Sequence, residues 1–215
     1  MQNTPLACPL CQYNKIEFYF EDIRSYWQCD NCQLVFVAPS EHLNEADEKE
    51  RYDLHENNAD DEGYLHFLNK LIKPFSERLP AGSRGLDFGC GPGPTVSLML
   101  EELGHKVECY DKYYANDVSL LAKSYDFVTS TEVLEHLREP REELQRLTRM
   151  LRPNGYLGIM TKLLPPFEKF ADWHYKRDLT HICFYSESTF EWVAAYWDLS
   201  LEIIGNDVVI LQSGN

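Results

Sequence analysis

The sequence lacks the features of a secreted or membrane-spanning protein. Its 215 residues contain no apolar run of the roughly 18 residues that a membrane-spanning helix needs. The first ten residues, MQNTPLACPL, have no basic region followed by a long apolar stretch, which a secretory signal peptide would require. We therefore expect a cytoplasmic protein that has no membrane partner.

Basic residues are also scarce. Lysine and arginine number 20 against 35 aspartates and glutamates, which gives a formal net charge of -15 at pH 7. This charge repels a phosphate backbone, so nucleic acid is disfavoured as the main partner. Acidic residues are concentrated in residues 41–62, which we interpret as an acidic linker or a lid. Within it, Tyr52 and His55 either point inward over a bound ligand or belong to a solvated linker.

Disulfides are not expected among the seven cysteines of a cytoplasmic protein. Four of them form two Cys-x2-Cys pairs, Cys8 with Cys11 and Cys29 with Cys32. This spacing is typical of a structural zinc site with four thiolate ligands. The segment between the pairs predicts two short aromatic strands that are too small to fold without a metal. We expect a zinc ribbon over residues 1–40, with buried cysteine turns or a redox pair as the alternatives.

The rest of the chain alternates between helical and extended patterns. A helix is expected in GYLHFLNKLIKPFSERL, and the next helices in TVSLMLEELG and PREELQRLTRML. Strands are expected in RGLDFG, HKVECYD, YDFVTST and YLGIMTK. Strands separated by helices form a parallel sheet that has helices on both faces. A last helix, SESTFEWVAAYW, precedes LSLEIIG and DVVILQS, which predict an antiparallel hairpin.

The stretch GLDFGCGPGP joins a buried strand to a helix, and a ligand can approach the backbone closely where side chains are missing. Its glycines are Gly89, Gly91 and Gly93. A dinucleotide fingerprint would place its third glycine at position 94, which is Pro94. Asp87 precedes the glycines and favours a ligand with a cationic amino group over a pyrophosphate. Asp111, at the end of the next strand, is placed to accept hydrogen bonds from ribose hydroxyls.

These motifs resemble the class I S-adenosylmethionine-dependent methyltransferases over about residues 63–215. LDFGCGPG is similar to the first motif of that family, CYD to the acidic second motif, YDFVTSTEVLEHL to the fourth-strand motif, and LRPNGYLGIMT to the entry into strand five. The resemblance implies a Rossmann-like sheet of seven strands and a methyltransferase domain over 63–215. It also implies S-adenosylmethionine as the cofactor, held by Asp87, Gly89, Gly91, Gly93 and Asp111. Only residues 112 to 125 separate Asp111 from Asp126, where the family has a helix and a third strand, and Asp117 is the candidate for the missing adenine contact.

A second group of polar residues follows the fourth expected strand. In TEVLEH, the side chains of Glu132, Glu135 and His136 can share one helical face. The run resembles the metal motif of small-RNA 2′-O-methyltransferases and ubiquinone-pathway O-methyltransferases, and THICFYSESTF places His181 as the further ligand. The resemblance implies a possible Mg²⁺ site, and the alternative is a polar helix start that binds no metal.

The segment ADWHYKRDLTHICFYS lies where this fold forms its acceptor pocket. Its candidates for catalysis are His181, His174 and Tyr185, with His181 first because histidine titrates near neutral pH. We expect a methyltransferase that acts on an oxygen or carbon of a small-molecule acceptor. The alternatives are a metal-assisted RNA 2′-O-methyltransferase and a non-catalytic cofactor-binding module whose ribbon binds a partner. The sequence leaves the acceptor and the oligomeric state open.

Overall fold

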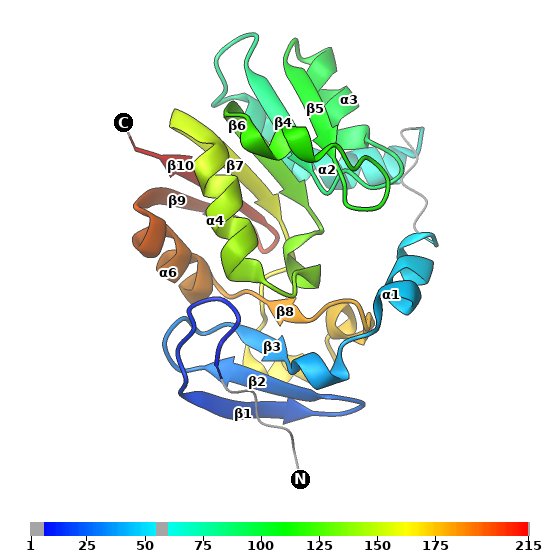
Figure 1. Ribbon diagram of the computed structural model, residues 1–215, viewed down its shortest axis with the longest axis vertical. Coiled ribbons are helices and arrows are strands. Elements are labelled where there is room, and N and C mark those ends of the chain that lie inside the picture. The colour runs from blue at the N-terminus through cyan, green and yellow to red at the C-terminus, as the bar shows by residue number, and fades with distance from the viewer. Residues whose placement is uncertain (1–6, 55–59, 215) are drawn as a thin grey trace.

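The computed structural model describes residues 7–54 and 60–214 and contains two β-sheets (Figure 1). The larger sheet has the strand order β5-β4-β6-β7-β10-β9. Its strands are β4 (Arg84–Phe88), β5 (Lys106–Tyr110), β6 (Tyr125–Thr131), β7 (Leu151–Met160), β9 (Leu199–Ile204) and β10 (Val208–Ser213). Strands β4 to β7 are parallel, and β10 is antiparallel to both of its neighbours. The expected Rossmann-like α/β sheet with an antiparallel C-terminal hairpin is confirmed.

Among the described residues this sheet has six strands rather than the seven that were expected. After β5, Asp111 and Ala115 form an isolated antiparallel β-bridge. The chain then forms a short 3-10 helix, η2 (Val118–Ala122), before β6 begins. One more parallel strand here would need two crossovers of about a dozen or more residues each, and only residues 111–124 lie between β5 and β6. The sheet therefore ends at β5.

Helices cover both faces of the larger sheet. They are α2 (Glu62–Ser76) and α3 (Thr95–Glu102) on one face, and α4 (Pro140–Met150) and α6 (Glu187–Trp197) on the other. Neighbouring residues of a strand point to opposite faces. On β10, Val208 and Ile210 pack with α2, whereas Val209 and Leu211 belong to the core below α4 and α6. Both layers are therefore closed from water.

The smaller sheet joins the N-terminal ribbon to a distant part of the chain. Its order is β1-β2-β3-β8, with β1 (Ile16–Glu21), β2 (Ser25–Cys29), β3 (Val35–Val37) and β8 (Cys183–Phe184). The two ribbon strands expected from the sequence are present as β1 and β2. β8 comes from the predicted acceptor segment and pairs with β3 in antiparallel register. The ribbon and the acceptor segment thus belong to one sheet.

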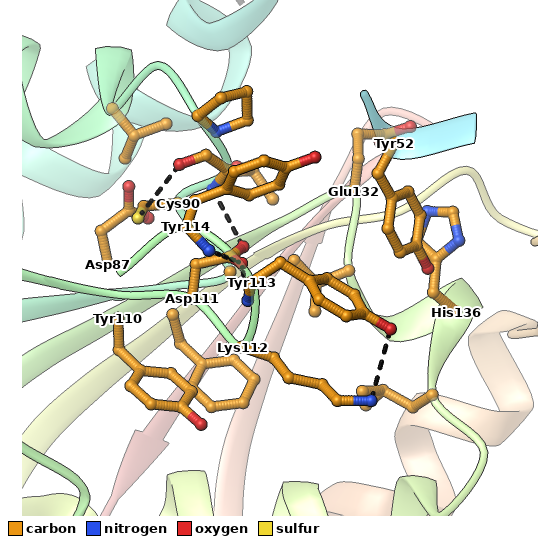
Figure 2. A pocket seen from close by; sticks show the side chains of 18 of the residues that line it. Tyr52, Asp87, Cys90, Tyr110, Asp111, Lys112, Tyr113, Tyr114, Glu132 and His136 are labelled. Atoms are coloured by element: carbon orange, nitrogen blue, oxygen red, sulfur yellow. Dashed lines mark hydrogen bonds between the residues drawn. The ribbon is translucent and has the colours of Figure 1, made fainter. Parts of the chain in front are cut away.

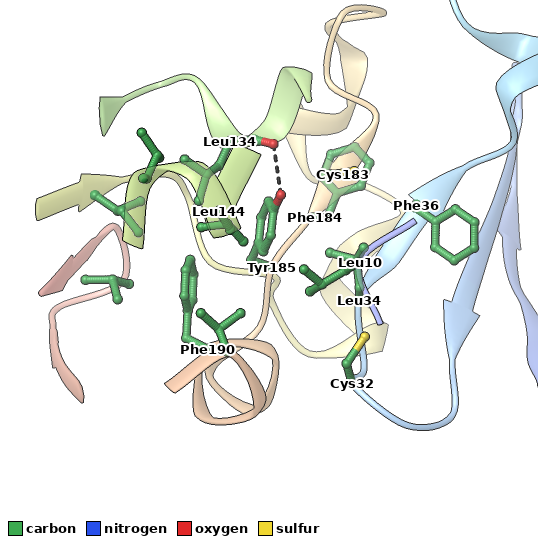
Figure 3. Close-up of a cluster of buried hydrophobic side chains, with 14 of the residues drawn as sticks. Leu10, Cys32, Leu34, Phe36, Leu134, Leu144, Cys183, Phe184, Tyr185 and Phe190 are labelled. Carbon is green, nitrogen blue, oxygen red and sulfur yellow. Dashed lines mark hydrogen bonds between the residues drawn. The ribbon is translucent and has the colours of Figure 1, made fainter. Parts of the chain in front are cut away.

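The ribbon also shares its hydrophobic core with the larger domain. Figure 3 shows Leu10 and Leu34 of the ribbon beside Tyr185, and Phe190 of α6 on the other side of that ring. Leu10, Leu34, Tyr185 and Phe190 are each 0% exposed. A single apolar cluster of buried residues extends from the cysteine turns to Leu144 of α4.

Helix α1 (Glu45–Tyr52) follows the short helix η1 (Pro39–Glu41) and has no buried residue. Ion pairs hold it to the larger domain: Arg138 lies 2.6 Å from Glu48, and Lys112 pairs with Glu45. Exposed pairs of this kind contribute up to about 1 kcal/mol each. α1 is therefore held weakly compared with the helices of the core.

Three further helical turns complete the description: η3 (Leu134–His136), α5 (Phe167–Phe170) and η4 (His174–Arg177). No helix in the described part of the chain is long and apolar enough to cross a membrane.

We expect Leu10→Ala to destabilise the ribbon and the larger domain together, because Leu10 fills their shared core. The loss should be about 2 to 5 kcal/mol of unfolding free energy, as for other buried leucines. Urea unfolding followed by tryptophan fluorescence and by far-UV circular dichroism would measure it. Leu103→Ala, at a side chain that is 54% exposed, is the matched control and should change stability by less than about 0.5 kcal/mol. A separate early transition of the ribbon alone would contradict a shared core.

Candidate functional site

A cavity of about 640 Å³ opens at the carboxyl ends of β4, β5 and β6. In open α/β sheets ligands bind at this edge, where loops after neighbouring strands converge. The volume falls within the roughly 300–1,000 Å³ of small-molecule sites. The cavity lining includes all five residues that the family resemblance assigned to the cofactor: Asp87, Gly89, Gly91, Gly93 and Asp111.

The glycine loop after β4 has a backbone that other residues would not adopt easily. Gly89 has a φ of +79° and Gly91 a φ of +64°, both in the left-handed region. A Cβ on Gly89 would lie 2.3 Å from Cγ2 of Val133. The Gly89 amide donates a 2.7 Å hydrogen bond to the Tyr110 carbonyl, which ties the loop to β5. The loop therefore brings bare backbone to the cavity wall.

Two carboxylates flank this loop and differ in their surroundings. Asp87 is only 1% exposed and accepts a 2.9 Å hydrogen bond from Thr129 Oγ1. Burial raises the pKa of Asp87 from 3.8 to about 7. Asp111 accepts hydrogen bonds from the amides of Gly91 at 3.1 Å, Tyr113 at 2.7 Å and Tyr114 at 3.1 Å. A carboxylate has about four lone-pair positions, so Oδ2, which accepts only from Gly91 among these amides, can accept one more donor from a ligand.

Aromatic side chains form much of the remaining cavity wall. Of these residues, only Tyr52 was a candidate from the sequence. Tyr64 and Phe67 come from α2, and Tyr113 and Tyr114 follow Asp111. The Tyr64 and Phe67 rings stack with centroids 6.4 Å apart. The signal in the sequence is the tyrosine pair in KYYAND directly after the second motif. Such rings can sandwich a flat ligand.

The opposite end of the cavity contains histidines and carboxyl groups. Figure 2 shows the Tyr52 ring beside His136, with Asp87 and Cys90 across the cavity. The Tyr52 and His136 rings are 5.2 Å apart, and the His136 and His181 rings 4.7 Å apart. Ligand atoms of Glu135, His136 and His181 all lie within 4.8 Å of one another. The structure thus brings His181 to the strand-four motif, although it lies 45 residues after His136 in the chain.

The sequence spacing allowed Glu132 and Glu135 to share one helical face. In the structure they do not. Only Leu134–His136 is helical, and Glu132 precedes it with a φ of +53°. The Tyr175 hydroxyl lies between the two carboxyl groups, 2.5 Å from Glu135 Oε1 and 3.2 Å from Glu132 Oε2. Positive φ is uncommon outside glycine and clusters at functional sites. Glu132 lines the cavity but lies outside the group of three close ligand atoms.

The tautomers of the two histidines follow from their hydrogen bonds. His181 Nδ1 lies 2.8 Å from the Tyr175 carbonyl and His136 Nδ1 lies 3.2 Å from the Thr180 carbonyl. A carbonyl only accepts, so each Nδ1 carries the proton, and Nε2 of the neutral ring is unprotonated. Burial lowers the pKa of His181 to about 4. His181 is therefore neutral at pH 7, with Nε2 able to accept a proton or bind a metal.

Glu135 is 0% exposed, and burial raises its pKa. Its Oε2 atom has no hydrogen-bond partner among the described residues. A buried carboxylate oxygen without a partner is costly unless a cation or a proton meets it. Together with two imidazoles that carbonyls orient, this carboxylate forms a donor set suited to a divalent metal.

The other candidates from the sequence lie away from the cavity. His174 is exposed, and its Nε2 is 3.4 Å from Lys162 Nζ. Tyr185 is fully buried and donates a hydrogen bond to the Leu134 carbonyl at 3.0 Å. Asp117 caps η2 by accepting from Ser119 and does not line the cavity. His55 lies outside the described residues.

The two cysteine pairs of the ribbon have the same local geometry. The residue after each pair, Gln12 and Gln33, has a φ of 62° and 59° respectively. The Gln12 amide donates to the Cys8 carbonyl at 3.0 Å, and the Gln33 amide donates to the Cys29 carbonyl at 3.0 Å. Each pair is thus a tight turn that points two sulfurs to one side.

The four sulfurs converge on one point. Cys8 Sγ lies 3.6 Å from Cys32 Sγ, Cys11 Sγ lies 3.3 Å from Cys29 Sγ, and all four lie within 4.8 Å of one another. A zinc ion bound by four sulfurs at about 2.3 Å would set sulfur–sulfur distances of about 3.8 Å. The arrangement fits a tetrahedral zinc ion that has no open ligand position.

Comparison with known proteins identifies the family. A methyltransferase domain model matches residues 58–202. The ubiquinone biosynthesis O-methyltransferase of Xanthomonas axonopodis pv. citri is 32% identical over 123 residues, covering 45% of this chain and 51% of that protein. Its mitochondrial counterpart from Schizosaccharomyces pombe is 30% identical over 128 residues, covering 45% and 46%. The chain spans about half the length of these relatives.

A solved structure supports the same fold. The magnesium protoporphyrin IX methyltransferase of Synechocystis PCC 6803, solved with bound SAH, aligns with a TM-score of 0.55 at 14% identity. The alignment covers 79% of this chain and 94% of that one.

We expect the stability of the ligand-free protein to fall as the pH rises, because Asp87 must ionise in a buried place. The neutral carboxyl of Asp87 contributes fully to the free energy of unfolding below its unfolded-state pKa of about 3.9. This contribution is lost as the pH rises through the folded-state pKa of about 7. Asp87→Asn should remove about 1 to 4 kcal/mol of this dependence in urea unfolding between about pH 4 and pH 8. The control Asp117→Asn, at an exposed carboxyl, should keep it. An unchanged profile in Asp87→Asn would show that Asp87 is not the group that titrates.

Proposed function

Because the chain belongs to the methyltransferase domain family, with the class I S-adenosylmethionine-dependent fold, we propose that it methylates a hydroxyl group of a small molecule. One observation carries the proposal. A single cavity joins the glycine loop, with Asp87 and Asp111, to His136 and His181, whose ligand atoms lie close to that of Glu135. One cavity would therefore hold the cofactor at one end and the acceptor at the other.

The cofactor end fits S-adenosylmethionine. Bare glycine backbone, a buried carboxyl and an accepting carboxylate suit a ligand with a cationic amino group and a ribose. Asp87 would hold the amino group and Asp111 the ribose hydroxyls, with Gly89, Gly91 and Gly93 around the chain between them. When bound, the cofactor supplies a methyl group on a positively charged sulfur.

The acceptor end supplies a base. His181 lines the cavity and Nε2 of its neutral ring is unprotonated, so we propose that it takes the proton of an acceptor hydroxyl. His136 and Tyr52 would position the acceptor beside it, since their rings form the same wall. Much of the rate of a methyl transfer comes from holding the two reactants at close distance in line. The ubiquinone O-methyltransferases named above support oxygen as the methylated atom.

A divalent metal at Glu135, His136 and His181 is the alternative arrangement, in which His181 Nε2 binds the metal instead of taking the proton. Two imidazoles and one carboxylate favour a metal such as Zn²⁺ or Mn²⁺ over Mg²⁺, which prefers oxygen ligands. The expected Mg²⁺ therefore fits these residues poorly. A metal there would hold the acceptor oxygen and favour its deprotonated form.

The domain arrangement also remains a proposal. We propose a structural zinc ion at Cys8, Cys11, Cys29 and Cys32 in the ribbon of residues 1–40. In residues 41–62, α1 would act as a lid, because Glu48 and Tyr52 line the cavity while surface ion pairs hold the helix. Residues 63–215 form the methyltransferase domain.

The purified protein offers a direct test of the whole proposal. Mass spectrometry of the small molecules released on denaturation should identify S-adenosylmethionine or S-adenosylhomocysteine, and metal analysis should find zinc bound to the ribbon cysteines. A panel of phenols and catechols with labelled S-adenosylmethionine would then test methyl transfer. Cofactor binding without transfer to any acceptor class would favour a non-catalytic module. Transfer to RNA would favour the nucleic-acid alternative, which the charge of -15 opposes.

We expect Asp111→Ala to weaken the binding of S-adenosylhomocysteine by about 1 to 3 kcal/mol, because ribose hydroxyls would lose their acceptor. Isothermal titration calorimetry measures the change. Asp117→Ala removes a carboxylate that lies outside the cavity and should leave the affinity unchanged. Equal affinity in Asp111→Ala and the wild type would remove Asp111 from the cofactor site.

We expect Glu135→Gln to abolish a Mn²⁺ site that is separate from the ribbon zinc. Its Mn²⁺ affinity, measured by electron paramagnetic resonance titration of protein that holds one zinc ion per chain, in the ribbon, should fall about tenfold to a hundredfold. Glu143→Gln is the matched control, since Glu143 also lines the cavity and has its pKa raised by burial. If wild type binds no Mn²⁺ or Zn²⁺ beyond the ribbon site, the cluster serves proton transfer alone.

A further inference from the structure

A ribbon side chain holds the backbone of the loop that carries His181. Arg24, in the turn between β1 and β2, is 5% exposed. Its guanidinium donates to four carbonyls of that loop: Lys176 at 3.1 Å, Asp178 at 3.0 Å, Leu179 at 2.9 Å and His181 at 2.6 Å. Its Nε donates to the Tyr26 hydroxyl at 3.2 Å. Both terminal nitrogens of this guanidinium thus donate to the backbone of residues 176–181.

The loop also contacts the ribbon through a cationic side chain, that of Lys176. The ammonium group of Lys176, which is 4% exposed, pairs with the Asp22 carboxylate. It also lies 5.1 Å from the ring centroid of Phe20 and 5.7 Å from that of Phe170. Asp22, Phe20 and Arg24 all belong to the β1–β2 hairpin or its turn. The hairpin therefore holds the loop through two buried cations.

The same loop is bonded to the cavity wall on its other side. Ile182 donates a 2.7 Å hydrogen bond to the Glu135 carbonyl and accepts one of 2.9 Å from the Val37 amide of β3. The Thr180 carbonyl accepts from His136 Nδ1 at 3.2 Å. The loop thus lies between the ribbon and η3, in hydrogen-bond contact with both.

The orientation of the His181 ring depends on this loop. Its Nδ1 donates to the Tyr175 carbonyl, six residues earlier, at 2.8 Å. This hydrogen bond spans residues 175–181, whose backbone carbonyls include the four that Arg24 binds. A change in the backbone between residues 175 and 181 would move the acceptor of that bond. The position of the unprotonated Nε2, on the other side of the ring, would then no longer be fixed.

We propose that Arg24 is a positioning residue for the active site, and that it fixes the tautomer and direction of the His181 ring through the backbone of residues 176–181. The proposal rests on the function proposed above, in which His181 Nε2 is the acceptor-side base or ligand. The zinc ribbon then forms an internal part of the active site. Removing the guanidinium would leave four buried or half-buried carbonyls to find other donors.

Arginine is required here for a geometric reason. A guanidinium offers five donors in a planar fork, whereas a lysine ammonium offers three donors at one point. The four carbonyls lie around both terminal nitrogens of Arg24, with Leu179 on Nη1 and the others on Nη2. Among the described residues no carboxylate lies within ion-pair distance of Arg24, so the group is held by carbonyl dipoles.

The test uses full-length protein with ¹⁵N-labelled histidine and one zinc ion per chain, in the ribbon, so that no metal occupies His181. Long-range ¹H–¹⁵N spectra at neutral pH should show a single Nδ1-protonated tautomer for His181, assigned with His181→Gln. In Arg24→Gln the His181 signals should shift toward a mixture that includes the Nε2-protonated tautomer. Arg24→Lys should give a partial shift, and it decides the matter if Arg24→Gln does not fold. Arg152→Gln, which removes an exposed arginine paired with Asp126, is the matched control.

Binding of S-adenosylhomocysteine by calorimetry accompanies each spectrum. Arg24→Gln should change that affinity by less than about twofold, since the cofactor end has no contact with Arg24. Failure of the wild type to bind S-adenosylhomocysteine would sink the proposed function, whatever the spectra show. Unchanged His181 signals in folded Arg24→Gln, or in Arg24→Lys where Gln does not fold, would overturn the positioning role while the function stands.

Discussion

The need of a buried loop for hydrogen-bond partners links the two halves of this protein. Residues 176–182 form almost no regular structure, yet their carbonyls are directed into the interior. Buried carbonyls must find donors, and here Arg24 from the ribbon and His136 from the cavity wall supply them. β8 then continues into the ribbon sheet directly after this loop. Neither the ribbon nor the site is complete without that segment.

A second constraint is the burial of negative charge around the cavity. Asp87, Glu132 and Glu135 are all buried or nearly so, and burial raises the pKa of each. Such carboxyl groups weaken a fold that binds nothing, and they favour binding of positively charged ligands. A cationic amino group at Asp87 and a divalent metal at Glu135 would each compensate a buried negative charge. Part of the chain's excess of acidic residues would thus serve to bind positively charged ligands.

Local sequence patterns predicted the parts of this fold that depend on neighbours in the chain. The helices, the parallel strands, the glycine loop and the paired cysteines each follow from spacing that a single segment contains. The missing strand was signalled by the short connection after Asp111, although the family resemblance led to seven strands being expected. What the sequence did not show was contact between distant segments. Tyr175 between two glutamates, β8 in the ribbon sheet and the positive φ of Glu132 all arise from tertiary packing.

Residue type alone also misjudged two candidates for catalysis. Tyr185 has the chemistry of a proton donor, but its hydroxyl is used by the Leu134 carbonyl within the shared core. His174, only seven residues from His181, lies on the exposed side of η4. His181 differs from both because its backbone is fixed from two sides, by Arg24 and by the Tyr175 carbonyl that its ring reaches.

The zinc ion proposed for the ribbon would affect the cavity because the ribbon packs directly on the larger domain. A structural zinc contributes its binding free energy to whatever folds with it. Here Leu10 and Leu34 of the cysteine turns pack on Tyr185, and β3 bonds Ile182, which in turn bonds Glu135. The ordering that a zinc ion would give to the turns would therefore extend, through apolar contacts and backbone hydrogen bonds, to the residues proposed to bind the acceptor. In this way the ribbon would contribute directly to the geometry of the site.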